Sequence, residues 1–238
     1  MPPTLLALDT ATELCSVALA WGGRIVEHVE VVGQSHSERI LPMVDALLRE
    51  SGLQLGDCDA IAFGAGPGAF TGLRIACGVA QGLAFGAGKP VVAVGNLAAL
   101  AQAARSTAPG ARTVLAAVDA RMQEVYWAEY SFDDDTLVER SAPALAAATE
   151  LPDICRQLAP ELIAGNALRA FAALTAALDV PTAPDANAAA GTIAALAARK
   201  FAAGGATHPA LAAPIYVRDR VALTIGERRA AGAAAGRR

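Results

Sequence analysis

The sequence predicts an α/β protein of two lobes, in which mixed sheets are flanked by helices. Apolar runs of strand length alternate along the chain with longer stretches whose apolar residues recur at helical spacing. The strand–turn–strand pattern that opens the chain returns near residue 113, and each opening places an aspartate, Asp9 or Asp119, at the end of an apolar strand. A chain of 238 residues has room for one large domain or for two smaller ones. The repeated opening favours a duplicated fold.

The first lobe is predicted over residues 1–106, with the element order βββαβαβα. Its first three strands are antiparallel, and Gly22-Gly23 forms the hairpin turn between the second and the third. The predicted strands are 4–9, 15–21, 24–32, 59–63 and 91–95. The predicted helices are 38–48, 72–85 and 96–105.

The second lobe is predicted over residues 107–225, after a stretch that contains Ser, Pro and Gly at residues 106–112. Its strands 113–119 and 124–132 repeat the opening of the first lobe. Helices are expected at 151–158, 167–178 and 187–203. The small and basic residues 226–238 show no periodicity, which predicts a disordered tail.

The composition argues against several classes of protein. Hydrophobic residues make up 54% of the chain, but alanine inflates this figure and no stretch of about 18 large apolar residues occurs, which disfavours a membrane protein. The first residues carry no basic segment, so we expect no secretory signal and a cytoplasmic location. The four cysteines form no C-x-x-C pair, which predicts reduced core cysteines. A net charge of −4 disfavours a broad surface for nucleic acid.

The segment from residue 64 to residue 74 is the most informative stretch, because a glycine-dense turn joins an apolar strand to the start of a helix. Backbone N–H groups at a helix N-terminus bind anions, and Gly64, Gly66 and Gly68 would leave a phosphate free to approach them. The alternative is that these glycines serve a tight turn beside another backbone. The spacing matches neither the dinucleotide-binding pattern nor a P-loop, which disfavours both of these motifs. Phosphate binding and a tight turn stay open as interpretations of the glycines.

Four segments, in this order, make the chain closely resemble the TsaB (YeaZ) family over nearly its whole length. They are Leu8-Asp9-Thr10-Ala11-Thr12, His36-Ser37-Glu38, the run from Gly64 to Arg74, and Pro214-Ile215-Tyr216-Val217-Arg218. The resemblance implies a duplicated actin-like, sugar-kinase-like fold (ASKHA, with ribonuclease H-like lobes). It also implies a non-catalytic subunit that binds a TsaD-like catalytic paralogue in the synthesis of tRNA threonylcarbamoyladenosine. A TsaE-like ATPase is a further implied partner, tRNA is contacted only indirectly, and the chain alone is expected to form a homodimer.

A pair of metal-binding histidines is missing where TsaD-like proteins carry it. The corresponding helix has Asn96 and Leu100 in place of two histidines that share one face. We therefore predict no metal site and no catalytic residue. His36 beside Ser37 resembles a base and its nucleophile, but a helix-capping Ser37 with an exposed His36 is the favoured interpretation, which disfavours a peptidase.

Helices 38–48 and 72–85 are the predicted partner-binding elements. Gly78, Gly82 and Gly86 recur every four residues in the second helix and give a smooth row on which another helix can pack. TsaB-like proteins use the corresponding helices to join TsaD or another copy of themselves. The candidate contacts are Ile40, Met43, Val44, Leu47, Leu73, Ala76, Val79, Ala80 and Leu83.

A nucleotide site between the lobes is the remaining expectation, since actin-like ATPases hold phosphates there. The turn after Asp9 contains no glycine and carries Glu13, which would repel phosphate, so we expect weak or no binding by the isolated chain, and ADP or ATP only at the joint with the partner. The rival hypothesis is an active ATP-dependent kinase or acyltransferase of the same fold, which turnover of ATP would reveal. The candidate nucleotide contacts are Asp9, Thr10, Gly64, Gly66 and Gly68.

Overall fold

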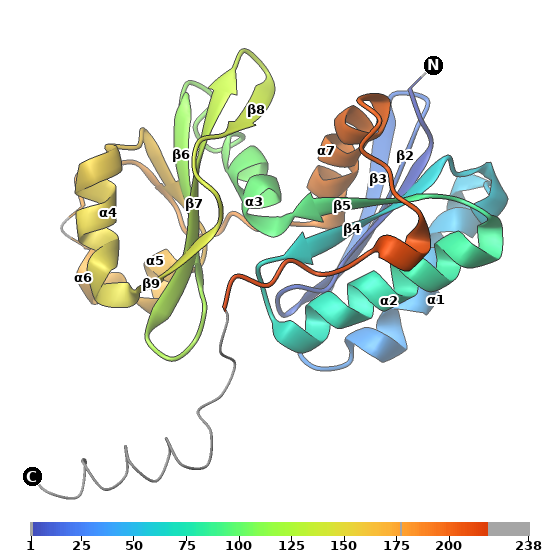
Figure 1. Ribbon diagram of the computed structural model, residues 1–238, viewed down its shortest axis with the longest axis horizontal. Helices are drawn as coiled ribbons and strands as arrows, with labels where there is room; N and C mark the ends of the chain where they lie inside the picture. The colour runs from blue at the N-terminus through green and yellow to red at the C-terminus, as the bar shows by residue number, and fades with distance from the viewer. Residues whose placement is uncertain (1, 177, 219–238) are drawn as a thin grey trace, which may run out of the picture.

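The computed structural model, which describes residues 2–176 and 178–218, contains two sheets, each with helices packed on it (Figure 1). The first sheet has the strand order β3-β2-β1-β4-β5. The second has the order β11-β10-β6-β7-β8, and β9 pairs with β7. Strand β1 runs antiparallel to β2 and parallel to β4, so the first sheet is mixed, as is the second. The predicted α/β class with mixed sheets is confirmed.

The first sheet and its helices follow the predicted order, with the boundaries moved by a few residues. Gly22 and Gly23 form the predicted hairpin turn with φ of 57° and 80°. The strands are β1 (Leu5–Asp9), β2 (Leu14–Trp21), β3 (Arg24–Val31), β4 (Ala60–Gly66) and β5 (Val91–Gly95). The helices are α1 (His36–Ser51), the short 3-10 helix η1 (Leu55–Asp57), α2 (Phe70–Ala87) and α3 (Asn96–Ala104).

The second sheet contains more strands than the sequence predicts. Strands of two to four residues are too short to show a periodic pattern, and only the two long ones were expected. The strands are β6 (Thr113–Asp119), β7 (Glu124–Asp133), β8 (Thr136–Glu139), β9 (Ala144–Ala147), β10 (Leu162–Ala164) and β11 (Thr182–Ala183). The predicted helix 167–178 is wrong, because Phe171 leaves helical geometry and separates two short helices. The helical elements are η2 (Ala148–Glu150), α4 (Leu151–Leu158), α5 (Ala167–Ala170), α6 (Ala172–Thr175), α7 (Ala190–Ala202) and η3 (Pro209–Leu211).

Helix α7 departs from the predicted division after residue 106. It packs against β1, β2, β4 and β5 of the first sheet, although it comes late in the chain. The Ser16 hydroxyl accepts a hydrogen bond from the Ala190 N–H at 2.9 Å, and Thr207 forms a bridge with Val91. The division at 106/107 therefore separates the two sheets but not the helices that cover them. The predicted tail, 226–238, lies outside the described residues.

Strands β1 and β4 of the first sheet are buried on both faces, as Figure 1 shows for α1 and α2 on one side and α7 on the other, whereas the edge strand β3 is largely exposed. Successive side chains of a strand point to opposite faces. Leu6 and Leu8 accordingly join the cluster under α1 and α2, whereas Leu5 and Ala7 join the cluster that contains the α7 side chains. All four cysteines are free and buried, as predicted. In the described part of the chain, no helix is both long and apolar enough for a membrane span.

Candidate functional site

The end of strand β1 forms the centre of the candidate site. Asp9, the last residue of β1, is completely buried. Asn96 at the start of α3 donates from Nδ2 to Asp9 Oδ1 at 2.7 Å, and the Ala11 N–H donates to Asp9 Oδ2 at 3.2 Å. Asn96 Oδ1 in turn accepts from the Gly66 N–H at 2.6 Å. The Asp9 carboxyl group therefore belongs to a closed network that links β1, β4 and α3.

Burial dominates the electrostatics of Asp9. It raises the pKa of the carboxyl group from 3.8 to about 7, because a charged carboxylate loses its hydration there. The hydrogen bonds from Asn96 and Ala11 act in the opposite direction and lower this pKa, while the charge of Glu27 raises it slightly. At neutral pH the group is thus divided between its charged and neutral forms.

Two glycines, one in β4 and one in the first turn of α2, lie too close to the end of β1 and the residue after it to carry a side chain. A Cβ on Gly64 would lie 2.0 Å from Asp9 Oδ1, and a Cβ on Gly72 would lie 1.8 Å from the Thr10 carbonyl oxygen. The Thr10 hydroxyl also donates to the Gly72 carbonyl oxygen at 2.7 Å. Close approach to another backbone is therefore what the structure shows at Gly72, whereas the group that excludes a side chain at Gly64 is the carboxyl group of Asp9.

A cleft of about 990 Å³ lies between the two sheets, and we call it the interlobe cleft. Its first wall contains the residues Thr10–Glu13 after β1 and the first turn of α2. Its second wall contains Asp119–Arg121 at the end of β6. The C-terminal residues Ile215–Arg218 line it as well. The two strand ends that the sequence singles out therefore face one common space.

The second wall is built around the turn between β6 and β7. Asn166 Oδ1 accepts a hydrogen bond from the Asp119 N–H at 2.8 Å, and Arg121 forms an exposed ion pair with the Asp119 carboxylate. Arg218 donates from Nη2 to the Ala120 carbonyl oxygen at 2.9 Å and pairs with Glu124. No sequence pattern pointed to Asn166, and Arg218 stood out only as part of a motif to which no role was attached.

The predicted nucleotide contacts divide into two groups. Thr10 and Gly68 line the interlobe cleft. Asp9, Gly64 and Gly66 do not, because all three are buried behind the turn after β1. An actin-like ATPase needs an acidic residue that reaches metal and water in the cleft. The buried Asp9, held by Asn96, does not fit that role, and we derive no nucleotide chemistry through it.

The predicted partner contacts on α1 and α2 require correction, because most of them are buried in the core of this chain. The apolar residues of an amphipathic helix face the sheet, so the large side chains selected from the sequence point inward. Val79 and Leu83 are partly buried and pack against the same core. The others have exposed fractions of 4% or less; they are Ile40, Met43, Val44, Leu47, Leu73, Ala76 and Ala80.

The outward face of these two helices contains different residues. Gly78, Gly82 and Gly86 are exposed, and a Cβ at any of the three would meet nothing within 4 Å. Leu41 and Pro42 are exposed on the neighbouring helix α1, where 49% of Leu41 is accessible. We call these five residues the outer α1/α2 face. The sequence reveals the glycine row, but it cannot show by itself that this row faces away from the sheet.

The pair His36 and Ser37 does not have the predicted arrangement. His36 is buried, and its Nε2 lies 2.9 Å from the Thr12 carbonyl oxygen, whereas Ser37 is exposed. Helix α1 begins at His36 and has no side-chain cap. The expected Ser37 cap and the exposed His36 are therefore wrong. Within residues 2–176 and 178–218, no group of three or more His, Cys, Asp or Glu could hold a metal ion.

Architecture defines the class of this protein first. The chain matches the crystal structure of the ROK hexokinase from Thermus thermophilus with a TM-score of 0.51 at 14% identity, over 84% of this chain and 99% of that one. At this identity the match concerns the fold alone. The protein thus has an α/β fold of the actin-like, sugar-kinase-like type.

Closer relatives then define the family. A family model described as TsaD, tRNA N6-adenosine threonylcarbamoyltransferase, matches residues 28–213. YeaZ from Pseudomonas aeruginosa is 42% identical with a TM-score of 0.82, over 90% of this chain and 99% of that one. A second Pseudomonas aeruginosa structure, described as an uncharacterized protein with similarity to peptidase YeaZ, is also 42% identical, with a TM-score of 0.83 over 91% and 100%. The chain therefore belongs to this family, on its TsaB (YeaZ) branch.

Curated relatives match over a shorter stretch. The tRNA threonylcarbamoyladenosine biosynthesis protein TsaB of Haemophilus influenzae is 55% identical over 53% of this chain and 53% of its own length. The Escherichia coli protein of the same name is 53% identical over 55% of this chain and 56% of its own length. These matches span about half the length of the curated relatives.

Proposed function

We propose that this chain is a non-catalytic subunit in the biosynthesis of tRNA threonylcarbamoyladenosine, where it binds a TsaD-like catalytic paralogue. The observation that carries the proposal is the identity of 55% and 53% to two proteins named for this pathway. The burial of Asp9 supports the non-catalytic role, because the acidic group at the end of β1 does not reach the interlobe cleft. Asn96 supports it as well, since its amide holds Asp9 and Gly66 at the helix start where a histidine would bind metal.

The outer α1/α2 face is the proposed contact with the paralogue. A row of exposed glycines lets a second helix approach closely, and the exposed Leu41 and Pro42 of α1 add apolar surface. Each interior glycine costs a helix up to about 1 kcal/mol relative to alanine. Among residues 2–176 and 178–218, no group packs on Gly78, Gly82 or Gly86 and offsets this cost. A partner helix packed on this glycine row would offset the cost.

Substitution of Gly82 by arginine tests this contact. The Arg side chain would project into open space in the free chain but into the interface of the complex, where an unpaired charge costs several kcal/mol. We expect Gly82→Arg to fold like the wild type and to bind the paralogue from the same organism at least about 100-fold more weakly. Calorimetric titration measures the affinity, and circular dichroism measures the fold.

A matched control comes from Gly110, which is equally exposed, has open space at its Cβ and lies in the loop between α3 and β6. Gly110→Arg should bind the paralogue with wild-type affinity and support modification of tRNA by the reconstituted complex. Wild-type affinity in Gly82→Arg would remove this face as the contact. Ala76→Arg is unsuitable as a probe, because Ala76 is completely buried and its substitution should unfold the chain.

Catalysis by the isolated chain is the outcome that would overturn the non-catalytic role. We expect the purified chain neither to transfer threonylcarbamoyl to tRNA nor to hydrolyse ATP. Turnover of ATP above about 1 per second, lost in Asp9→Ala, would instead show an active kinase or acyltransferase. Peptidase chemistry has no support in the geometry, since His36 contacts backbone carbonyl oxygens and is not paired with Ser37.

The remaining partners stay predictions. A TsaE-like ATPase, a homodimer of the free chain and ADP or ATP at the joint with the paralogue are part of the proposal, and titration of ADP into the chain and into the complex tests the last. Contact with tRNA should lie mainly on the paralogue, because this chain carries a net charge of −4. Submicromolar binding of tRNA by the chain alone at physiological salt would contradict that assignment.

A further inference from the structure

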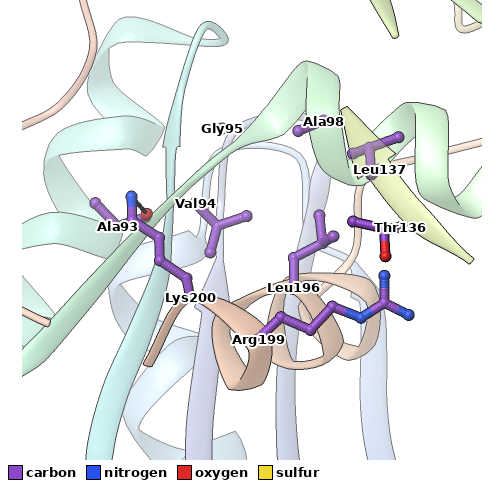
Figure 2. Close-up of a pocket in the computed structure, with 9 residues that line it drawn as sticks. All are labelled: Ala93, Val94, Gly95, Ala98, Thr136, Leu137, Leu196, Arg199 and Lys200. Carbon is purple, nitrogen blue, oxygen red and sulfur yellow. Dashed lines mark hydrogen bonds between the residues drawn. The ribbon is translucent and has the colours of Figure 1, made fainter. Parts of the chain in front are cut away.

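A second cavity, of about 300 Å³, lies apart from the interlobe cleft and shares no lining residue with it (Figure 2). Four elements surround it: the end of β5, the first turn of α3, the start of β8 and the last turns of α7. The first sheet contributes β5 and its cover α7, and the second sheet contributes β8. Neither the proposed function nor the family assigns a role to this place.

The wall of this second cavity is apolar. Val94 is 5% exposed and belongs to the buried core, and Leu137 and Leu196 pack against the same core from β8 and α7. Figure 2 shows these side chains directed into the space between α7 and α3. Such a wall favours the aliphatic part of a ligand over water.

Two cations stand at opposite ends of this wall. Lys200 Nζ donates to the Ala93 carbonyl oxygen at 2.8 Å, at the β5 end. Arg199 Nη1 donates to the Asp135 carbonyl oxygen at 2.5 Å, and Figure 2 shows its guanidinium group beneath Thr136, at the β8 end. The two head groups thus diverge from consecutive residues on the last turns of α7.

Neither cation has a carboxylate partner in the part of the chain that the structure describes. The nearby carboxylate of Asp135 pairs with Arg105 instead. Cations near a helix C-terminus interact favourably with the helix dipole, but that interaction and a bond to a carbonyl oxygen leave the full positive charge in place. Both exposed head groups therefore keep their positive charge beside the apolar wall, and each has N–H donors beyond the one that its bond to a carbonyl oxygen uses.

We propose that the second cavity binds a short aliphatic dicarboxylate. One carboxylate would accept hydrogen bonds from Arg199, the other from Lys200, and the methylene groups between them would lie against Val94 and Leu196. A cavity of about 300 Å³ has room for a dicarboxylic acid of five or six carbon atoms. The charge at both ends, rather than at one, distinguishes this ligand class from fatty acids and from simple anions.

Titration with matched probes at constant ionic strength tests the proposal. The probes are adipate, valerate, 1,5-pentanediol and inorganic phosphate, and the readout is the shift of the backbone amide resonances of Val94 and Thr136. We expect adipate to bind at least tenfold more tightly than valerate, and the diol and phosphate not to shift these resonances. Equal affinity for adipate and valerate, or for adipate and phosphate, would overturn the assignment.

Three variants locate the binding. Arg199→Gln and Lys200→Gln should each reduce the affinity for adipate to that for valerate, because each leaves one carboxylate without its cation. Both residues are exposed, so the fold should persist. Arg140→Gln, at an exposed arginine of the second sheet that does not line the cavity, should keep wild-type affinity. Unchanged adipate binding in either cavity variant would contradict the proposal.

Discussion

At the scale of single residues, Asp9 shows how the fold removes an acidic group from the chemistry for which its sequence position suits it. An aspartate that ends the first strand of an actin-like lobe could reach a ligand in the cleft. Here Thr10 bonds to Gly72, the following turn packs on the glycine-dense segment, and Asp9 is left facing Asn96. The Asp9 side chain is buried in the fold, so the ionisation of its carboxyl group should affect the stability of the protein.

The raised pKa of Asp9 predicts that stability falls as pH rises. Below pH 4 the group is protonated in both the folded and the unfolded chain. Between pH 4 and pH 7 only the unfolded chain, with the ordinary pKa of 3.8, releases the proton, and the folded chain holds it up to about 7. At about 1.4 kcal/mol per pH unit, the Asp9 contribution to the free energy of unfolding declines by roughly 4 kcal/mol over this range.

Urea denaturation at pH 5 and at pH 8 measures the part of this decline that lies above pH 5, about 3 kcal/mol, with Asp9→Asn as the decisive variant. Asparagine carries no charge to desolvate, so the variant should lose much less stability between the two pH values than the wild type. Asp119→Asn, at the equivalent strand end of the second sheet, serves as the control and should keep the wild-type dependence. An equal decline in wild type and Asp9→Asn would show that the buried carboxyl group does not control it.

At the scale of elements, the sequence of α2 predicts that a helix forms, but the packing on the sheet determines which face of that helix is buried. The spacing of its apolar residues predicts the helix, and α1 and β1–β3 follow equally well from periodicity and from the Gly22-Gly23 turn. Which face points inward depends on the sheet beneath, so the large residues Leu73, Val79 and Leu83 were assigned to a partner although they cover the core of this chain.

Other parts of the fold depend on contacts between distant segments and leave no local pattern. Helix α7 reaches the first sheet through bonds such as that from Ala190 to Ser16, across 174 positions of the sequence. The short strands β10 and β11 exist only because they pair with a neighbour. At the site, the two strand-end aspartates were predictable, whereas the partners Asn96, Asn166 and Arg218 come from elsewhere in the chain.

Two glycines of α2 differ in their surroundings, and substitution of each tests this difference: Gly72 lies against the backbone of Thr10, and Gly82 faces open space. Gly72→Ala would place a Cβ 1.8 Å from the Thr10 carbonyl oxygen, and we expect a loss of at least about 2 kcal/mol, since backbone must move. Gly82→Ala places the Cβ in open space and should stabilise the free chain by about 0.5–1 kcal/mol, because alanine is the better helix former. Thermal denaturation of both variants measures the difference, and effects of the same sign would contradict the assignment.

At the scale of the whole molecule, the C-terminal residues 212–218 join the two halves across the interlobe cleft, as the last coloured segment of Figure 1 shows. The Ile215 N–H donates to the Ala65 carbonyl oxygen of β4 at 2.6 Å, and Tyr216 stacks on Phe70 of α2 with ring centroids 5.7 Å apart. Arg218, three residues later, bonds to Ala120 and Glu124 in the turn between β6 and β7. We call this segment the C-terminal strap.

The turn that Arg218 holds is strained. Arg121, Met122 and Gln123 have φ of 63°, 55° and 60°, and each non-glycine residue in this left-handed region costs on the order of 1 kcal/mol. Such a turn persists only when its surroundings determine it. The side chain of Arg218 is 15% exposed and supplies both a hydrogen bond and an ion pair at this point.

Replacement of Arg218 by methionine should therefore release the turn while the apolar part of the side chain is kept. We expect the amides of residues 120–124 to exchange hydrogen at least tenfold faster, and the free energy of unfolding to fall by about 2 kcal/mol, the contribution of a hydrogen bond to a charged group. Tyr216→Phe is the control, because it removes only the exposed bond from Arg74 Nε at 3.1 Å and leaves the arginine in place. Wild-type exchange at residues 120–124 in Arg218→Met would show that the turn keeps its shape without the Arg218 side chain.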